Sequence, residues 1–492
     1  MERQPPVLSH GNHQGDSPMA TLIQTTISEN RGQPRLWIEG GRLAREGLAP
    51  GMILSGRIQD GQLIFAPANG EAPANDSEFQ VTVSRRKRGD KITPLLEVRL
   101  PILSKLFGLA ARVVVKLMRG KLCVSRHHQD VKIKERERSL VECLEGGQSL
   151  KIASLYHGGG GLDCALHEGL EKAGIESYCA LASEIEGKYM DASLANNPHL
   201  FRDDSLILNA PVEQLQFANS GAFSVHALVG GVPCTGASSA GKAKLQLAYA
   251  EQHPSAGAQF FAFLKMIELT NPAICILENV CQYRNTPSYA IILSVLKTLG
   301  YRVSDRDLNG NIFGALENRD RMAMVAVSEG LPLEFDIEAI PVLAEKPAAL
   351  AEVLEPAEAV EERFRDYDYL RIKEERDRKA GKGFMRQLLT PDAVSVPTIT
   401  RDYNKVRSTD PQLAHPSDPV LTRLFTPLEH ARIKGIPERI IKNLADTTAH
   451  QILGQSVIYP AFMALGYSLG HALRRLVSAA QKECGKQPAI AA

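Results

Sequence analysis

The chain of 492 residues lacks the usual marks of a disulfide-bonded, metal-binding or membrane protein. Its eight cysteines form no Cys-x-x-Cys pair and no metal-ligand spacing, which predicts free thiols, a reducing compartment and no metal site. No apolar stretch approaches the roughly 18 residues of a spanning helix, and the N-terminus has no apolar signal region. We therefore expect a cytoplasmic protein without a membrane partner.

The chain also carries almost no net charge. The balance is +1, so a nucleic-acid surface must be local rather than spread over the whole molecule. The length exceeds that of one typical core, which predicts two or more domains. Residues 1–20 are rich in His, Gly, Pro, Ser and Gln and are predicted to form a disordered tail, and 481–492 form a second tail.

A short β-rich pattern occurs twice within residues 21–130. In the first copy, two apolar runs flank a turn at Asp60-Gly61, which is a hairpin signal. About 59 residues later the same pattern flanks Arg119-Gly120. The sequence therefore predicts a small β domain that is duplicated in tandem.

The run from Leu43 to Phe65 resembles the swapped-hairpin barrel domains of AbrB and SymE-like proteins. Those barrels normally form from two chains, and two copies in one chain would close the β-barrel without a partner. The resemblance thus implies a monomer or a homodimer through this N-terminal domain. Such domains often bind DNA, and the basic run at 85–88 fits that use, although a solvated turn also explains it.

The remainder of the chain has an α/β pattern with one interruption. Residues 131–150 predict a charged helical linker, and strands alternate with helices over 151–330 and again over 421–480, as in a doubly wound sheet. The segment 331–420 between them differs in composition. Within it, 358–379 is densely charged with opposite charges at i,i+4 spacing, which predicts an exposed helix.

Glycines follow the first predicted strand of this α/β region. The strand 151–156 runs into His-Gly-Gly-Gly-Gly-Leu-Asp and then a helical pattern. Glycines in this place let the backbone approach a ligand at a helix N-terminus, although a tight structural turn would use them too. The next strand ends in Ser-Glu-Ile-Glu (183–186), where an acidic residue can accept hydrogen bonds from ribose, and Asp203-Asp204 follows the next turn, placed to meet an adenine amino group. Either acid alone would more commonly cap a helix.

A thiol and a carboxylate end two further apolar runs. The first run stops at Pro233-Cys234 and the second at Glu278, so both groups could face one substrate at the edge of the sheet. A thiolate suits attack on an electron-poor carbon, which a neighbouring acid can make poorer by protonating the ring. A buried structural thiol and a capping carboxylate are the alternatives. Arg319 and Arg321 are expected on one face of an incoming strand.

Taken in order, these motifs resemble those of the DNA cytosine-5 methyltransferases across nearly all of 151–478. The implied fold is an α/β class I S-adenosylmethionine-dependent methyltransferase, Rossmann-like with a mostly parallel sheet. Its core would comprise 151–330 and 421–480, with 331–420 as an inserted target-recognition region. The matching motifs are Tyr156–Gly161, Pro233-Cys234, Glu278-Asn279-Val280, Arg319-x-Arg321, Arg423–Pro437 and Gly454–Val457.

The resemblance implies S-adenosylmethionine as the cofactor, double-stranded DNA as the partner, and a role for each matching residue. The implied catalytic residues are Cys234, Glu278, Arg319 and Arg321. The implied cofactor contacts are Tyr156, Gly158, Gly160, Gly161, Leu162, Glu184, Ile185, Asp204, Pro233 and Gln455. The expected DNA contacts are Ser238, Ser239, Lys242 and Lys244 in the loop after the thiol, and Arg401, Lys405 and Arg407 in the target region.

Four positions depart from the family's pattern. Thr235 replaces the Gln after the cysteine, Glu317 replaces the Gln before the arginine pair, Gln455 replaces an Asn, and His157 replaces a small residue. None of these removes the nucleophile, the acid or an arginine. They therefore bear on cofactor affinity and rate rather than on the type of reaction.

The mechanism that the resemblance implies begins with the thiol. Cys234 would add to cytosine C6 while Glu278 hydrogen-bonds N3 and the exocyclic amine, and C5 would then attack the methyl group. Loss of the C5 proton and departure of Cys234 would restore the ring, with Arg321 holding the base carbonyl and Arg319 supporting the loop. The base must flip out of the duplex to be reached, and the loop 236–244 would close over it.

Two other functions stay open on the sequence alone. The same chemistry on RNA is one, and the DNA-type N-terminal domain argues against it. A catalytically silent DNA-binding regulator is the other, and the intact Cys234, Glu278 and Arg321 argue against that. As a bacterial DNA-modifying enzyme, the protein is expected in the cytoplasm and associated with the nucleoid.

Overall fold

The computed structural model describes residues 20–68, 78–216, 223–233, 250–253 and 257–484. The chain divides into two compact units, Met1–Lys132 and Ile133–Ala492. Helix α3 (His128–Glu145) crosses the boundary between them. Each unit has its own hydrophobic core.

The first unit contains the same order of elements twice. The first set is β1 (Thr21–Thr26), β2 (Ser28–Asn30), β3 (Gln33–Glu39), α1 (Gly41–Arg45), β4 (Ile53–Gln59) and β5 (Gln62–Pro67). The second set is β6 (Glu78–Thr82), β7 (Ser84–Arg88), β8 (Lys91–Arg99), α2 (Ile102–Leu106), β9 (Arg112–Met118) and β10 (Lys121–Arg126). Both hairpins turn through two residues with positive φ, Asp60-Gly61 and Arg119-Gly120, as two-residue hairpin turns require.

The two sets exchange their first strands. β1 pairs with β9 of the second set, and β6 pairs with β4 of the first, so the six-stranded sheet has the order β1-β9-β10-β5-β4-β6. The remaining strands form a four-stranded sheet, β2-β3-β8-β7. Ile27 and Val83, both fully buried, follow the exchanged strands and bond to the backbone of the other set. Resemblance to the swapped-hairpin barrels itself stays a prediction.

The second unit is built on a seven-stranded sheet in the order β13-β12-β11-β14-β15-β18-β16. Six of the seven strands run in the same direction, and β18 is antiparallel to its neighbours β15 and β16, so the predicted mostly parallel sheet is confirmed. The strands are β11 (Leu150–Leu155), β12 (Ser177–Ser183), β13 (Leu206–Leu208), β14 (Ala227–Gly231), β15 (Ile274–Asn279), β16 (Tyr301–Asn309) and β18 (Asp320–Ser328).

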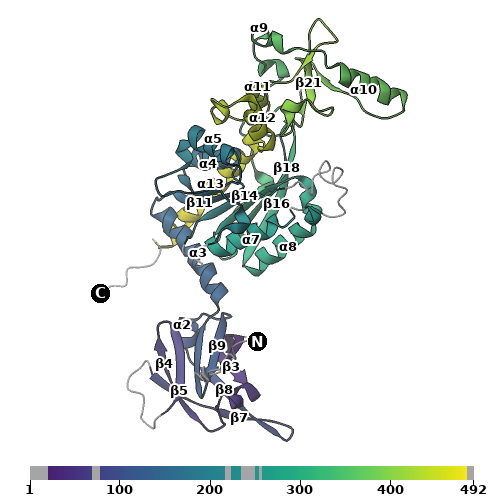
Figure 1. The fold of residues 1–492 in the computed structure, drawn as a ribbon. Coiled ribbons are helices and arrows are strands. Elements are labelled where there is room, and N and C mark those ends of the chain that lie inside the picture. Colours follow the sequence, from purple (N-terminus) through teal and green to yellow (C-terminus); the bar gives the residue numbers. More distant parts are fainter. Residues whose placement is uncertain (1–19, 69–77, 217–222, 234–249, 254–256, 485–492) are drawn as a thin grey trace, which may run out of the picture. The chain divides into compact units, whose positions relative to one another are not determined.

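Helices cover both faces of this sheet (Figure 1). Alternate residues of β15 enter opposite cores, with Ile274 and Ile276 on one side and Cys275 and Leu277 on the other. Such runs, apolar on both faces, are typical of a covered parallel sheet. One face packs against α4 (Gly161–Lys172), α5 (Gly187–Asn196), α12 (Asp446–Gln455) and α13 (Tyr459–Cys484), and the other against α7 (Gln259–Thr270) and α8 (Pro287–Thr298).

The segment between β18 and α11 (Pro427–Ile433) packs on a small separate core, to which Leu316 and Ile433 also contribute. It contains α9 (Ala357–Val360), α10 (Asp368–Lys379), β19 (Gln387–Leu389), β20 (Val396–Pro397), β21 (Pro411–Ala414) and β22 (Thr422–Arg423). The predicted single helix over 358–379 is wrong, because Phe364 is extended and packs against this core while Arg365 pairs with Thr422. Only α10 keeps the charged pattern, with Glu375 and Lys379 2.7 Å apart.

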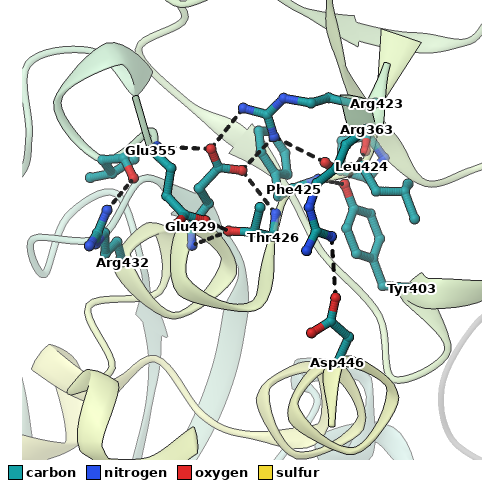
Figure 2. Close-up of polar contacts among 12 residues, drawn as sticks. Glu355, Arg363, Tyr403, Arg423, Leu424, Phe425, Thr426, Glu429, Arg432 and Asp446 are labelled. Atoms are coloured by element: carbon teal, nitrogen blue, oxygen red, sulfur yellow. Dashed lines mark hydrogen bonds and ion pairs between the residues drawn. The ribbon is translucent and has the colours of Figure 1, made fainter. Parts of the chain in front are cut away.

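A buried polar cluster joins this segment to α11 (Figure 2). The carboxylate of Glu429 accepts two bonds from Arg423, at 2.6 and 2.7 Å, and one from the backbone N–H of Thr426. Thr426 caps α11 in return, and the backbone N–H of Glu355 reaches Glu429 at 3.0 Å. Arg423 is buried, and its partner Glu429 makes three further hydrogen bonds. The cluster therefore holds the chain in a fixed conformation here.

No single helix in the described ranges is long and apolar enough to cross a bilayer. Two consecutive helices, α12 and α13 as far as Ser478, pass the same test of length and composition only when taken together, and they are bent by 49° at the break.

Candidate active site

Four residues of interest lie at the carboxyl edge of the parallel strands. Because parallel strands end at a common edge, their last residues are neighbours. Leu155 pairs with both Ser183 and Gly230, and Gly231 pairs with Glu278. The residues that follow or end the four strands are Tyr156 (β11), Glu184 (β12), Pro233 (β14) and Glu278 (β15).

The loop between β11 and α4 is shaped by backbone of positive φ. Tyr156, Gly158 and Gly160 have φ of 58°, 58° and 81°. The N–H of Gly158 donates to the carboxylate of Glu184 at 2.7 Å, which ties the loop to the end of β12. No heavy atom of the described residues lies within 4 Å of the Cβ position of Gly158. The loop therefore leaves open space beside a helix N-terminus, as an anionic ligand requires.

Gly161 begins α4 at a close approach to the end of α12. A Cβ at Gly161 would lie 2.3 Å from Ser456 Oγ, so any larger residue there would displace the Ser456 hydroxyl. Ser456 Oγ is buried and makes no hydrogen bond within the described part of the chain. A buried hydroxyl without a partner indicates a missing ligand or water. Gln455 beside it is exposed, and its amide donates to the carbonyl of Gln451 at 3.0 Å.

Glu184 and Ile185 form the second wall of this space. The other carboxylate oxygen of Glu184 accepts from the N–H of Glu186 at 2.9 Å, which fixes the side chain with lone pairs to spare. Ile185 is 65% exposed, so an apolar face is presented beside the carboxylate. Asn209, directly after β13, donates to the carbonyls of Glu184 and Ile185 at 2.8 and 3.1 Å. Sequence reasoning missed Asn209, although it ends an apolar run just as Glu184 does.

Asp204 lies elsewhere. It precedes β13, and its carboxylate accepts from the hydroxyl of Tyr178 at 2.9 Å, near the start of β12. Since β12 and β13 are parallel, this is the amino edge of both strands, whereas Glu184 follows the carboxyl end. The structure does not bring Asp204 and Glu184 together, and Asn209 lies beside Glu184 instead.

His157 is buried beneath the glycine loop rather than exposed to it. Its Nδ1 lies 2.9 Å from Ser154 Oγ and 3.0 Å from the carboxylate of Asp163, and its Nε2 lies 2.7 Å from Ser193 Oγ. The side chains of His157, Asp163 and Cys179 come close enough together to ligate a cation. Burial holds the pKa of Cys179 well above its ordinary value. A protonated thiol is a poor metal ligand, so we assign the cluster to the support of the loop.

Two predicted cofactor contacts have ordinary surroundings. Leu162, the second residue of α4, is half-buried against the core, and Pro233 is half-buried after β14. The segment before Pro233 is fixed by Asn279, whose amide donates to the carbonyl of Val232 at 3.1 Å. The Asn after the acid therefore has a structural task, which is to hold the end of β14 against β15.

Glu278 forms an ion pair at the centre of the edge. Arg321 Nε lies 3.0 Å from its carboxylate, and the two side chains are only 15% and 14% exposed. Burial raises the pKa of Glu278, and Arg321 and Arg319 oppose that rise. A carboxyl whose pKa is raised by burial can act as an acid, since its protonated form persists toward neutral pH.

Arg319 has different partners from Arg321. It is buried at the break between β17 (Glu317–Asn318) and β18, and it donates to the carbonyl of Gly454 at 3.2 Å. Its guanidinium lies 3.8 Å from the carboxylate of Glu317. Arg319 therefore connects the strand to the end of α12, while Arg321 faces Glu278.

The remaining predicted residues divide into two groups. Cys234, Ser238, Ser239, Lys242 and Lys244 lie outside the described residues, after the end of β14. The other group surrounds a short 3-10 helix, Tyr403–Lys405. There Arg401 contacts the Tyr189 hydroxyl at 3.0 Å, and Lys405 and Arg407 both pair with Asp402. The side chains of Arg401, Lys405 and Arg407 are exposed and basic. The carboxylate of Asp402 pairs with two of them, Lys405 and Arg407.

Comparison with known proteins gives matches over the same part of the chain. The family model of the C-5 cytosine-specific DNA methylases matches residues 150–471. The Type II methyltransferase M1.ScrFI of Lactococcus lactis subsp. cremoris is 27% identical over half of this chain, and the match spans 63% of that relative. The Type II methyltransferase M.NlaX of Neisseria lactamica is also 27% identical, over 66% of this chain and 97% of its own length.

The fold has a solved counterpart. A crystal structure of the S. pombe Dnmt2 methyltransferase superposes with a TM-score of 0.50 at 19% identity, and covers 66% of this chain and 99% of that one. At this identity the likeness bears on the fold alone. The family model covers well over half of the 492 residues, including the glycine loop, Glu278 and both arginines. The chain therefore belongs to the family of C-5 cytosine-specific DNA methylases.

Proposed function

We propose that the protein is a DNA cytosine-5 methyltransferase that acts on a cytosine flipped out of duplex DNA. The observation that carries the proposal is the buried Glu278–Arg321 pair, which ends β15 at the same sheet edge as the glycine loop and Glu184. An acid next to a fixed guanidinium can hold the N3 and O2 edge of one cytosine ring. Family membership supports the assignment.

The residues at the edge fit S-adenosylmethionine. Open space at Gly158, the free hydroxyl of Ser456 and the N-terminus of α4 suit the amino-acid end, while Glu184 suits the ribose hydroxyls. The exposed Ile185 offers an apolar surface to the adenine ring, and Asn209 lies beside it. When bound, the cofactor supplies an electrophilic methyl group to cytosine C5.

In this mechanism the side chains of the chain act on cytosine. The Cys234 thiolate forms a bond to C6 while Glu278, in its acid form, gives a proton to N3, which moves electron density onto C5. Arg321 binds the O2 carbonyl and keeps Glu278 in place. After C5 gains the methyl group, its proton is lost to a base, the S–C6 bond breaks, and N3 returns its proton to Glu278.

Replacing Glu184 by Ala should raise the Kd for S-adenosylmethionine by about 10–100-fold, since charge-assisted hydrogen bonds contribute roughly 1.5–3 kcal/mol. Asn209→Ala should raise it by about 2–10-fold through the loosened wall at Ile185. Asp204→Ala is the matched control, because it lies at the opposite edge, and it should leave the Kd unchanged. Titration calorimetry measures all three, and a loss of affinity in Asp204→Ala alone would contradict the assignment.

We propose that the N-terminal unit adds a second DNA contact and that the protein is a monomer. Residues 1–132 contain 19 Lys and Arg against 12 Asp and Glu, so they carry +7 and leave −6 on the rest of the chain. Four of these basic residues belong to β7, the edge strand of the four-stranded sheet. The strand exchange takes place within one chain, which supports a monomer.

Neutralising part of β7 tests this contact. The double variant Arg85→Gln/Lys87→Gln should lower the slope of log Kd for DNA against log salt by about 0.9 for each lost phosphate contact. The control Arg42→Gln/Lys105→Gln removes the same charge from exposed positions on α1 and α2. Equal slopes for both variants would reassign the basic run to a solvated turn.

A further inference from the structure

We propose that Glu317 and Lys434 form a buried positioning pair that holds Arg319 at the active site and fixes the target-recognition region to the catalytic sheet. The inference rests on the proposed function and adds two residues to it. Neither residue was among the predicted site residues, and Glu317 entered the sequence analysis only as a departure from the family's pattern.

The pair is completely enclosed. Lys434 Nζ lies 2.7 Å from Glu317 Oε2, and both side chains are fully buried. Burying two charges is costly unless each finds a partner and further hydrogen bonds. Breaking such a pair by removing one partner leaves an unpaired charge in the interior, so the arrangement holds only while both members are present.

The second carboxylate oxygen of Glu317 reaches into the target-recognition region. Oε1 accepts from the backbone N–H of Ile399 at 2.7 Å. In the same place β17 pairs with β20, with Glu317 opposite Val396 and Asn318 opposite Pro397. One side chain therefore fixes the strand that leads into Arg401, Lys405 and Arg407, the expected DNA contacts.

The same strand carries the two arginines. Glu317 Oε1 lies 3.8 Å from Arg319, whose other nitrogen bonds to the carbonyl of Gly454. Two residues further on, Arg321 faces Glu278 at 3.0 Å. On the Lys434 side, the N–H of Leu316 bonds to the carbonyl of Ile433, which seats α11 against the strand. A shift of Glu317 would thus move Arg319 directly and Arg321 through the backbone.

Charge links the pair to the acid. Burial and Arg319, opposed by Glu317, lower the pKa of Lys434 to about 7. Lys434 and Arg319 in turn bring the pKa of Glu317 below its ordinary value against the effect of burial. Lys434 also lowers the pKa of Glu278, and it faces Arg321 and His430 as well. Glu317 therefore stabilises the protonated form of Lys434, and the positive charge of Lys434 in turn lowers the pKa of Glu278.

The single variants Glu317→Gln and Lys434→Gln should lower kcat for methyl transfer by about 10–100-fold, since each leaves a buried group without its partner. A Gln at 317 can turn its oxygen to Ile399 or to Lys434, and its amide then faces the other as a second donor. In the double variant, one amide can donate to the other while Ile399 keeps its acceptor. We expect the double variant to recover to within about fivefold of the original kcat.

A pH profile separates positioning from simple support of the fold. In Lys434→Gln, the alkaline limb of kcat should move to higher pH, because removing a positive charge raises the pKa of Glu278. In the double variant the limb should return toward its original place. The Kd for S-adenosylmethionine should stay within twofold in every variant, and thermal unfolding reports any that fail to fold. Glu438→Gln is the matched control, since it breaks an exposed ion pair with Arg432, which lies two residues before Lys434.

Each outcome either supports or overturns the proposed role of the Glu317–Lys434 pair. Loss of kcat in the single variants, recovery in the double variant and a shifted alkaline limb would support the pair. Unchanged kcat in both single variants, or losses that simply multiply in the double variant, would overturn it while the proposed function stands. An unmodified protein that transfers no methyl group to DNA would overturn the proposed function and this inference with it.

Discussion

Replacement of Cys234 by Ala should abolish methyl transfer to DNA, by roughly 10⁴-fold or more, because the alanine has no thiolate to form the bond to C6. S-adenosylmethionine should still bind, since its expected contacts lie on the glycine loop, Glu184 and Ser456. The measurement uses methyl-labelled cofactor with duplex DNA of mixed sequence, followed by base-resolved sequencing. Label confined to cytosine C5 would identify the reaction and the target sequence together.

Cys281 provides the matched control for the thiol. It follows β15 near the same edge, and burial, with Asp307, raises its pKa to about 12. A thiol that stays protonated is a weak nucleophile, so Cys281→Ala should retain activity within about twofold. Activity that survives in Cys234→Ala but is lost in Cys281→Ala would identify Cys281, and not Cys234, as the nucleophile. Label on RNA and none on DNA would favour the RNA substrate.

Glu278→Gln should reduce kcat by about 10²–10⁴-fold, the range expected for loss of a positioned acid. The amide can still hydrogen-bond the ring, but it cannot give N3 a proton. It also leaves Arg321, only 15% exposed, without its carboxylate. Single-turnover rates at saturating cofactor measure the chemical step, and cofactor affinity measured alongside should be unchanged.

The pH dependence of this step has a definite sign. Burial raises the pKa of Glu278, so its acid form persists above the usual range of a carboxyl group and is lost as pH rises through that value. The rate should therefore fall on the alkaline side and, because the thiolate is the attacking form, also on the acidic side. In Glu278→Gln the alkaline limb should vanish. If the alkaline limb persists unchanged in Glu278→Gln, it reports the titration of another group.

Local sequence patterns predicted much of the site because its chemistry sits directly after strands. The glycines, Glu184 and Glu278 each follow or end an apolar run, and the parallel sheet brings such positions to one edge. Asp204 shows where this reasoning stops. The strand β13 is only three residues long, and the sequence gives a weak signal for so short an element. Its end, and therefore the residue at the carboxyl edge, could not be predicted. Asn209 was missed for the same reason.

Long-range pairings were also beyond the sequence. Glu317 and Lys434 are 117 residues apart along the chain, and nothing local marks either as the partner of the other. In the N-terminal unit the repeat predicted two hairpins, and both are present. Only the structure shows that each set gives its first strand to the other, since local periodicity specifies a strand but not its neighbour.

The exchange of first strands governs how the N-terminal unit can be made. Thr21 pairs with Leu117, so β1 has no partner until almost the whole unit has left the ribosome. At a rate of protein synthesis of about 5–20 residues per second, β1 remains without a partner strand for several seconds. Pairings this distant in sequence also slow the search for the native arrangement. The unit should therefore gain its structure in one late, cooperative step, and a chain cut between its two halves leaves neither half with a complete sheet.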